Sequence, residues 1–186
     1  MDDVYLSNAD SRDFAAEEWD RLCARDPKSL AVAEVDREIS VGELIDRARV
    51  RAGQFISQGV VPGSLVIVAR PNVIEFVVDY LAVRLCAGVL VNLPWGAGSS
   101  ILELAEILDA KVVVVSENLV GNNPIFDKLG DRRFREFEEA KIGPDRPLSK
   151  LGNELAWLAC TSGTTGTPKA AMHTGATWQR QSEMFA

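Results

Sequence analysis

The stretch from Leu65 to Leu93, "LVIVARPNVIEFVVDYLAVRLCAGVLVNL", decides the fold class of this chain. It opens with an apolar run, "LVIVA", that has no polar face; a helical pattern follows from about Asn72 to Leu85, and a second apolar run, "GVLVNL", ends it. Runs of Val and Leu separated by a helix are typical of parallel strands that are buried on both faces. The stretch therefore predicts a strand–helix–strand unit of a parallel sheet.

The same alternation continues towards the C-terminus. "SILELAEILDA" predicts a further helix, capped by Ser99 or Ser100, with Glu103 as the second member of a capping box. Two more strands are expected, "KVVVV" at 111–115 and "ELAWLACT" at 154–161. We therefore expect an α/β fold with a doubly wound, mainly parallel sheet and helices on both faces.

Two helices and a hairpin are expected before this region. Residues 11–25 have a helical period of apolar positions, and residues 30–40 are typical of a short hairpin that turns at Asp36 and Arg37. Ser40, with Glu43 three residues later, predicts the start of a second helix, which Gly59 ends. The buried stripe expected for this helix comprises Leu44, Ile45, Ala48, Ala52, Phe55 and Ile56.

Length and composition narrow the classes of function. With 186 residues, the chain is long enough for one domain with a substantial core. Its apolar fraction of 47% and charged fraction of 25% are typical of a globular protein in water. The net charge of −7 argues against a nucleic-acid backbone or an anionic membrane as the partner.

Neither a membrane span nor a signal peptide is expected. The most apolar region, residues 73–93, contains Glu75, Asp79 and Arg84, which are too many charges for a segment in lipid. The first residues, "MDDVYLSNADSRD", are acidic where a signal peptide would be basic and then apolar. We therefore expect a cytoplasmic protein.

The cysteines and the histidine do not suggest a metal site. Cys23, Cys86 and Cys160 are widely spaced, and His173 is the only histidine, so a zinc site is not expected. We expect all three cysteines to be buried, reduced thiols, because free Cys behaves as a small apolar residue. The alternative is a catalytic Cys160, which we disfavour because it follows an apolar strand.

Residues 118–150 are polar and carry Pro, Gly and mixed charge, so we expect a surface connection there. A short helical pattern around Asp131 to Ala140 is the one element expected within it.

The segment "TSGTTGTPK" (161–169) directly follows the last predicted strand. Gly163 and Gly166 let a ligand approach the main chain, successive N–H groups can surround an anion, and Lys169 adds a full positive charge. The spacing is not that of a Walker A loop, which needs Gly-Lys-[Ser/Thr] after four free positions. The segment therefore indicates a polyphosphate-binding loop, and the alternative is a flexible Ser/Thr/Gly linker.

This segment resembles the phosphate-binding signature of the adenylate-forming superfamily, in particular acyl- and aryl-CoA synthetases that form AMP. "ISVGELIDRARVRA", "GVVPGSLVIVARPNVIEFVVDYLAVRLCAGVLVNL" and "LAEILDAKVVVVSE" follow the order in which such enzymes begin. The resemblance implies that residues 1–186 are the N-terminal portion of an AMP-binding domain. The C-terminal lobe, with the family's later motifs, would then lie outside this sequence. The sequence departs from the family's usual residues at Ser40-Val41, Gly63-Ser64 and Ala170-Ala171.

The resemblance implies an enzyme that activates a carboxylic acid with ATP and Mg²⁺, releases pyrophosphate, and passes the acyl group from the adenylate to a thiol, usually that of CoA. No residue of this sequence matches the family's acid, base or acyl-pocket groups, so no catalytic residue is assigned. The residues that would hold the β- and γ-phosphates are Thr161, Ser162, Gly163, Thr164, Thr165, Gly166 and Lys169.

Three expectations follow about the isolated chain. It would bind ATP weakly without forming acyl-adenylates, its phosphate loop would be mobile, and copies of it would self-associate through apolar surface near Trp157. A non-catalytic binding or assembly module that keeps the loop is the alternative function. The acid substrate, the choice between CoA and a carrier protein, and the role of His173, including simple local packing, stay open.

Overall fold

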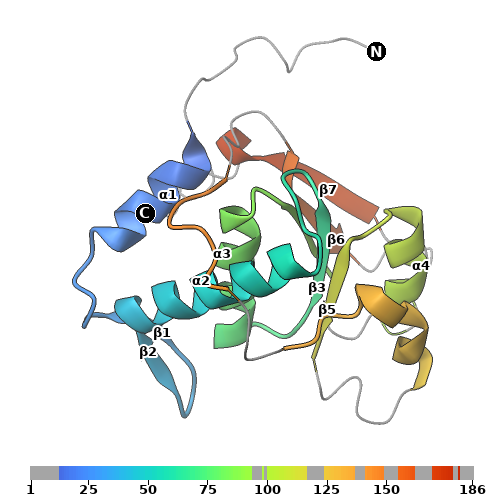
Figure 1. Cartoon of the computed structure of the whole chain (residues 1–186), viewed down its shortest axis with the longest axis horizontal. Helices are drawn as coiled ribbons and strands as arrows, with labels where there is room; N and C mark the ends of the chain where they lie inside the picture. The colour runs from blue at the N-terminus through green and yellow to red at the C-terminus, as the bar shows by residue number, and fades with distance from the viewer. Residues whose placement is uncertain are drawn as a thin grey trace.

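The computed structural model (Figure 1) describes residues 13–93, 98, 100–116, 124–136, 141–148, 155–161, 169–177 and 180, with Thr161 and Lys169 described at the level of the backbone. Its elements follow one another as α1 (Phe14–Cys23), β1 (Leu30–Ala33), β2 (Glu38–Ser40), α2 (Val41–Ser57), β3 (Leu65–Ala69), α3 (Ile74–Leu85), β4 (Val89–Asn92), α4 (Ser100–Ile107), β5 (Val112–Val115), the 3₁₀ helix η1 (Pro124–Arg132), β6 (Leu155–Thr161) and β7 (Lys169–Thr174).

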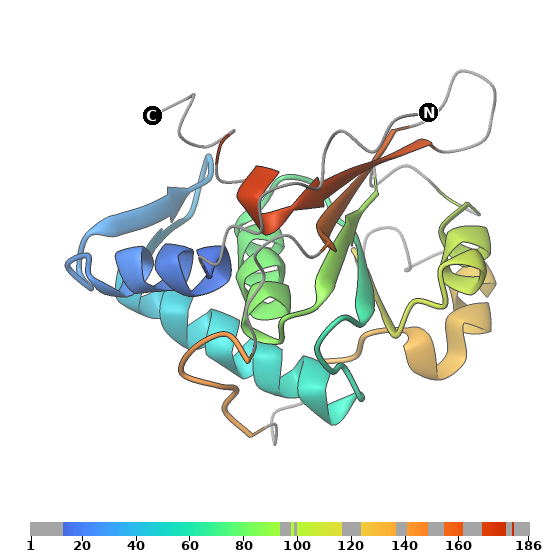
Figure 2. The same ribbon diagram turned by 90° about the horizontal axis from the view of Figure 1, so that it is seen from above.

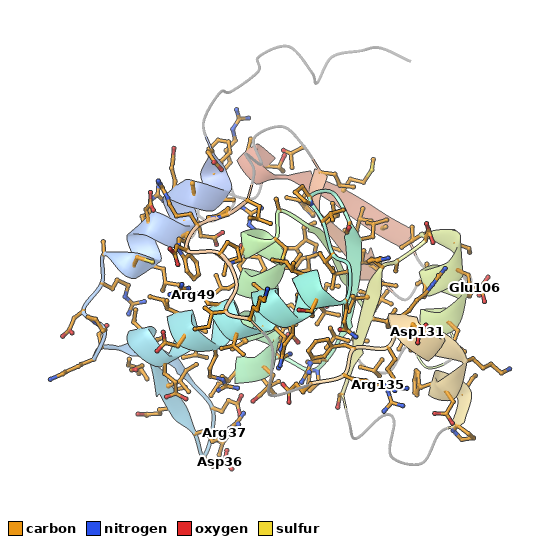
Figure 3. The ribbon with its side chains drawn as sticks, viewed as in Figure 1. Asp36, Arg37, Arg49, Glu106, Asp131 and Arg135 are labelled. Carbon is orange, nitrogen blue, oxygen red and sulfur yellow. The ribbon has the colours of Figure 1, made fainter. Side chains whose placement is uncertain are left out.

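The main sheet has the strand order β5-β3-β4-β6-β7. The pairs β3–β5, β3–β4 and β4–β6 are parallel, whereas β7 pairs with β6 in the antiparallel sense. The expected α/β class with a mainly parallel sheet is therefore confirmed. A separate two-stranded sheet, β1–β2, forms the expected hairpin, with Asp36 and Arg37 at its tip (Figure 3).

The order of the strands explains why helices cover both faces. The chain moves from β3 to its neighbour β4, and then returns past β3 to β5. Right-handed crossovers in opposite directions place their helices on opposite faces of a sheet. Accordingly, α2 and α3 cover one face, and α4 with η1 covers the other (Figure 2).

Strand β3 shows how one run of apolar residues supplies both halves of the core. Val66 and Val68 pack in the cluster under α2 and α3, whereas Ile67 and Ala69 pack in the cluster under α4 and η1. Successive side chains of a strand point to opposite faces, so a strand covered on both sides has no polar positions. This is the physical basis of the "LVIVA" pattern.

Helix α2 begins as predicted. The hydroxyl of Ser40 accepts a hydrogen bond from the backbone N–H of Glu43 at 3.2 Å, which satisfies one of the free donors of the first turn. The expected buried stripe is wrong at its last member, because the side chain of Ile56 is 38% exposed. Helix α3 begins at Ile74 rather than near Asn72.

The helix expected around Asp131 to Ala140 is also wrong in position. The helical segment is η1, and residues 133–136 after it are not helical; residues 137–140 lie outside the described part of the chain. Two aromatic anchors explain the shift. Phe126 of η1 is buried against the α4 side of the core, and Phe134 packs edge-on against Phe55 with ring centroids 5.2 Å apart. The backbone N–H of Phe134 donates to the carbonyl of Val113, which keeps this part extended beside β5.

The three thiols do not share one environment. Cys86 is buried, Cys160 is partly buried, and Cys23 is exposed, so the expectation of three buried thiols is wrong for Cys23. Cys23 is the last residue of α1, whose inner face is formed by Phe14, Ala15 and Trp19.

Residues 141–148 form a strap that crosses α2. Gly143 donates its N–H to the carbonyl of Arg49 at 2.9 Å, and the backbones approach so closely that a Cβ on Gly53 would lie 1.7 Å from the carbonyl oxygen of Lys141. The indole of Trp19 donates to the carbonyl of Asp145 at 2.7 Å. The strap therefore fastens α1 to α2. Within the described residues, no helix has the length and apolarity needed to cross a membrane.

Candidate functional site

Strands β6 and β7 bring the two ends of the predicted phosphate loop together. Their antiparallel register runs from Leu155↔Thr174 to Thr161↔Lys169, so the backbones of Thr161 and Lys169 are paired neighbours. The five remaining site residues lie outside the described part of the chain: Ser162, Gly163, Thr164, Thr165 and Gly166.

This strand pair ends at the edge of the sheet where ligands are expected. Because β6 is parallel to β4, Thr161 lies at the same edge as the carboxyl ends of β3 and β4. In open α/β sheets, ligands bind outside the carboxyl ends of the strands. The loop predicted from the sequence therefore starts and ends at the ligand-binding edge of the fold.

Packing on both faces fixes β6 in the sheet. The indole of Trp157 lies beside Tyr80 of α3, with ring centroids 5.7 Å apart, and Leu158 packs on the opposite face with the α4 side of the core. The hydroxyl of Tyr80 donates to the carboxylate of Glu18 at 2.7 Å, which ties α3 to α1. The strand that carries the loop is thus held by helices of both layers.

A polar hollow of about 430 Å³ lies next to this edge, where β3 and β5 end. Arg70 directly follows β3, and Ser116 directly follows β5. We call it the edge hollow, and it is lined by Arg47, Arg70, Pro71, Val73, Glu75, Ser116 and Glu136. Sequence reasoning did not find it, because its members come from four separate segments.

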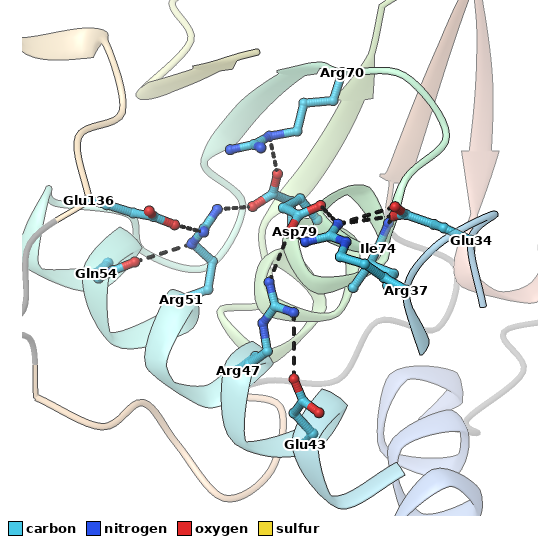
Figure 4. Close-up of polar contacts among 11 residues, drawn as sticks. Glu34, Arg37, Glu43, Arg47, Arg51, Gln54, Arg70, Ile74, Asp79 and Glu136 are labelled. Atoms are coloured by element: carbon cyan, nitrogen blue, oxygen red, sulfur yellow. Dashed lines mark hydrogen bonds and ion pairs between the residues drawn. The ribbon is translucent and has the colours of Figure 1, made fainter. Parts of the chain in front are cut away.

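A chain of four charged side chains, which we call the Asp79 network, lies beside this hollow; Arg51 and Asp79 are buried in it and Glu136 is exposed (Figure 4). It consists of Glu136, Arg51, Asp79 and Arg70, joined in that order by ion pairs, and the pair between Arg70 Nε and Asp79 Oδ2 measures 2.8 Å. Arg51 Nε also donates to Gln54, at 3.1 Å. The signal in the sequence was Asp79 itself, a single carboxylate within the apolar run "FVVDYLA" of helix α3.

The environment of Asp79 opposes its ionisation. Its side chain has no exposed surface, and burial raises its pKa to about 6, while the nearby charges of Arg51 and Arg70 act in the opposite direction. A buried carboxylate keeps its charge only when it is well paired. The two arginines supply that pairing.

Glu75 lies one turn earlier on α3, and its pKa is shifted in the opposite direction. Burial raises its pKa, but hydrogen bonds from Arg37 and Arg47 outweigh this and lower the pKa to about 2. The contacts measure 2.9 Å to Arg37 and 3.1 Å to Arg47. Glu75 is therefore an ionised anchor that ties the β1–β2 hairpin and α2 to the start of α3.

A second hollow, of about 570 Å³, lies over α2. It shares Arg47, Arg51 and Glu136 with the polar groups described above, and its apolar members are Val50 and Val78. Within the described residues, no group of three His, Cys, Asp or Glu side chains has an arrangement suited to a metal ion.

The environment of Cys160 favours a core thiol over a nucleophile, and that of His173 agrees with local packing. Burial raises the pKa of the Cys160 thiol, which disfavours the thiolate that a nucleophile needs. His173 lies within β7 in register with Trp157 of β6 and is partly buried. This position agrees with local packing of the histidine.

Comparison with known proteins agrees with this arrangement. Residues 19–184 match the family described as AMP-binding enzyme. Malpinin synthetase of Mortierella alpina is 30% identical over 154 residues, which is 78% of this chain and 2% of that protein. The nonribosomal peptide synthetase gloA of Glarea lozoyensis is 31% identical over 156 residues, which is likewise 78% of this chain and 2% of that protein.

Solved structures share the fold. A benzoate CoA ligase from Burkholderia xenovorans LB400 superposes with a TM-score of 0.74 at 20% identity, over 92% of this chain and 36% of that one. ATP-bound MatB from Rhodopseudomonas palustris superposes with a TM-score of 0.64 at 26% identity, over 86% of this chain and 35% of that one. The chain thus spans about a third of these structures and a small fraction of the peptide synthetases. It belongs to the AMP-binding enzymes of the adenylate-forming superfamily.

Proposed function

We propose that this chain supplies the nucleotide-phosphate site of an ATP-dependent ligase that converts a carboxylic acid into an acyl-adenylate and then a thioester. The observation that carries the proposal is the pairing of Thr161 with Lys169 at the carboxyl edge of a parallel sheet, in a chain of the AMP-binding family. A loop that leaves and re-enters the sheet at this edge is placed to meet a ligand there.

The proposed roles follow from the chemistry of the loop residues. Backbone N–H groups and hydroxyls would donate hydrogen bonds to the β- and γ-phosphate oxygens, and Lys169 with Mg²⁺ would offset their charge. Catalysis of such transfers consists mainly of positioning and charge stabilisation. The residues assigned to this task are Thr161, Ser162, Gly163, Thr164, Thr165, Gly166 and Lys169.

We propose CoA as the thiol that accepts the acyl group. The fold is shared with a benzoate CoA ligase and an anthranilate CoA ligase, which favours this choice. The identity to nonribosomal peptide synthetases makes a carrier-protein thiol the alternative. Assay of thioester formation with CoA and with a carrier protein, using the longest available form of the protein, distinguishes the two. Because the substrates are ATP and a small acid, we place the reaction in the cytoplasm.

The 186-residue chain is expected to bind ATP·Mg²⁺ weakly, with a Kd in the millimolar range, since part of the energy of a few phosphate contacts is offset by the entropy that the ligand loses on binding. Titration of the chain with ATP·Mg²⁺, followed by NMR, measures this. Lys169→Ala should weaken binding several-fold, and Lys28→Ala, an exposed lysine before β1, should not. Absence of binding by the unaltered chain, or equal binding by Lys169→Ala, would contradict the proposal.

ATP–pyrophosphate exchange over a panel of aliphatic and aryl acids tests turnover. We expect no exchange from the chain alone, because orientation of the carboxylate and the α-phosphate contributes up to about 7–11 kcal/mol to such reactions and no residue here is assigned to it. Robust exchange that Lys169→Ala abolishes would show that the chain is itself a catalyst. Binding without exchange in every longer form of the protein would favour the alternative, a binding or assembly module.

We further propose that copies of the chain self-associate through β7.

A further inference from the structure

Arg70 lies level with the start of the phosphate loop. The register pairs Val68 of β3 with Asn92 of β4, and Asn92 with Ala159 of β6. Arg70 follows Val68 by two residues, and Thr161 follows Ala159 by two. The two backbones therefore stand at the same height along the strands, separated by two strand spacings, which is about 10 Å.

This place is also the switch point of the sheet. After β3 the chain turns to α3 on one face, and after the neighbouring β4 it turns to α4 on the other (Figures 1 and 2). Neighbouring strands whose connections leave on opposite faces open a crevice at their carboxyl ends, and ligands bind in such crevices. Arg70 is the first residue after β3, one of the two strands at this switch point.

An ion pair holds the Arg70 side chain beside Asp79. Its Nε lies 2.8 Å from Oδ2 of Asp79, which is fully buried on α3. Figure 4 shows Arg70 beside Asp79. The side chain of Arg70 is 17% exposed and lines the edge hollow together with Ser116. A guanidinium has five N–H donors, and an ion pair through Nε leaves its two terminal nitrogens able to bind an anion.

The Asp79 network is neutral with Arg70 at its end. Arg51 pairs with both Asp79 and Glu136, so its single charge is shared, and Arg70 balances the second carboxylate. Glu75, which lines the hollow together with Glu136, pairs with Arg37 and Arg47. Arg70 is therefore the cationic end of the Asp79 network, and that end faces the carboxyl edge of the sheet.

We propose that the edge hollow is an anion subsite in which Arg70, assisted by the Ser116 hydroxyl, contacts a phosphate oxygen of the nucleotide or of pyrophosphate, and that Asp79 is the positioning residue for Arg70. The inference rests on the proposed function and adds to it a cation outside the phosphate loop. Arg suits this task because its planar donors match the oxygens of a phosphate.

Binding of inorganic pyrophosphate with Mg²⁺ to the 186-residue chain tests the subsite. Arg70→Gln is expected to weaken binding about tenfold, the usual size of one charge-assisted hydrogen bond, and Arg70→Lys by less. Arg132→Gln is the matched control, because it removes a half-exposed arginine from the opposite layer of the fold and should change the Kd by less than about twofold. Circular dichroism and thermal unfolding establish that each variant is folded at the temperature of the titration.

A double-mutant cycle tests the positioning role. Asp79→Asn should weaken pyrophosphate binding as Arg70→Gln does, and the double variant should be no weaker than either, because both changes remove one contact. Where Asp79→Asn does not fold, Arg70→Gln and Arg70→Lys decide the matter. Unchanged binding by Arg70→Gln, with weakened binding by Lys169→Ala, overturns the subsite and leaves the proposed function standing. Absence of pyrophosphate binding by the unaltered chain overturns both.

Discussion

At the scale of single residues, two carboxylates of one helix respond to pH with opposite signs. The folded-state pKa of Asp79 is about 6, above its ordinary value of 3.8, so the folded state holds its proton more strongly than the unfolded state does. The ionised form of Asp79 therefore opposes folding increasingly as the pH rises from about 4 to 6. Glu75 has a folded-state pKa of about 2, below its ordinary 4.5, and its ionised form favours folding. Each carboxylate has two arginine partners, and the difference lies in exposure: the side chain of Glu75 is 22% exposed, whereas that of Asp79 has no exposed surface.

The Glu75 contribution gives a prediction with a definite pH window. Its stabilisation should be complete above about pH 4.5 and should be lost as the pH falls towards 2. Because the side chain is partly exposed, we expect Glu75→Gln to lower the free energy of unfolding by about 1–2 kcal/mol at pH 7, and by less at pH 3.5. Urea unfolding at a series of pH values measures the difference. Glu17→Gln, which removes an exposed pair with Arg21, is the control, and a loss at Glu75 that is the same at every pH would contradict the assignment.

At the scale of elements, the strap of residues 141–148 shows where local patterns stop being informative. The period of apolar residues predicts the length of α2, and the Ser40 cap predicts its start, because both depend on residues close in sequence. Gly53 gave no such signal. It lies in mid-helix, where glycine is unfavourable, and its reason is the backbone of Lys141, far away in sequence. The position of Phe134 against Phe55 was missed for the same reason.

The sign of the stability change caused by Gly53→Ala distinguishes local helix propensity from the contact between α2 and the strap. Helix propensity alone predicts stabilisation of about 0.5–1 kcal/mol. A Cβ at this position would lie 1.7 Å from the carbonyl oxygen of Lys141, so the strap has to move away from α2. We expect the free energy of unfolding to fall by about 1–3 kcal/mol, as for other overpacked sites. Gly42→Ala in the first turn of the same helix, whose Cβ would lie 3.3 Å from Pro27, should cost less; stabilisation by Gly53→Ala would disprove the close approach.

At the scale of the whole molecule, the fold class could be read from the sequence and the edge hollow could not. Buried parallel strands such as β3 are apolar at every position, and this mark is visible without the fold. In the sheet, β3 lies between β4 and β5. The local sequence of β5, "KVVVV", does not indicate whether this strand pairs with "LVIVA" (β3) or with the other side of "GVLVNL" (β4). Arg70, Ser116 and Glu136 meet only because of that order. The phosphate loop could be predicted from the sequence because its pattern is contiguous.

Self-association is the prediction that belongs to this scale. The expectation placed the contact near Trp157, but its indole packs against Tyr80, so we place the contact on the next strand, β7. Strand β7 comes last in the order of the described strands, and its Met172 is 74% exposed. Edge strands offer backbone N–H and C=O groups to another chain, and a charged residue on the edge opposes this pairing.

We expect sedimentation velocity to show a concentration-dependent dimer of the chain at micromolar concentrations. Met172→Lys should shift it towards monomer, whereas Ile107→Lys, an equally drastic change at a 70% exposed position on α4, should not. A single monomeric species at all concentrations would refute the contact, and an equal effect of both variants would move it away from β7.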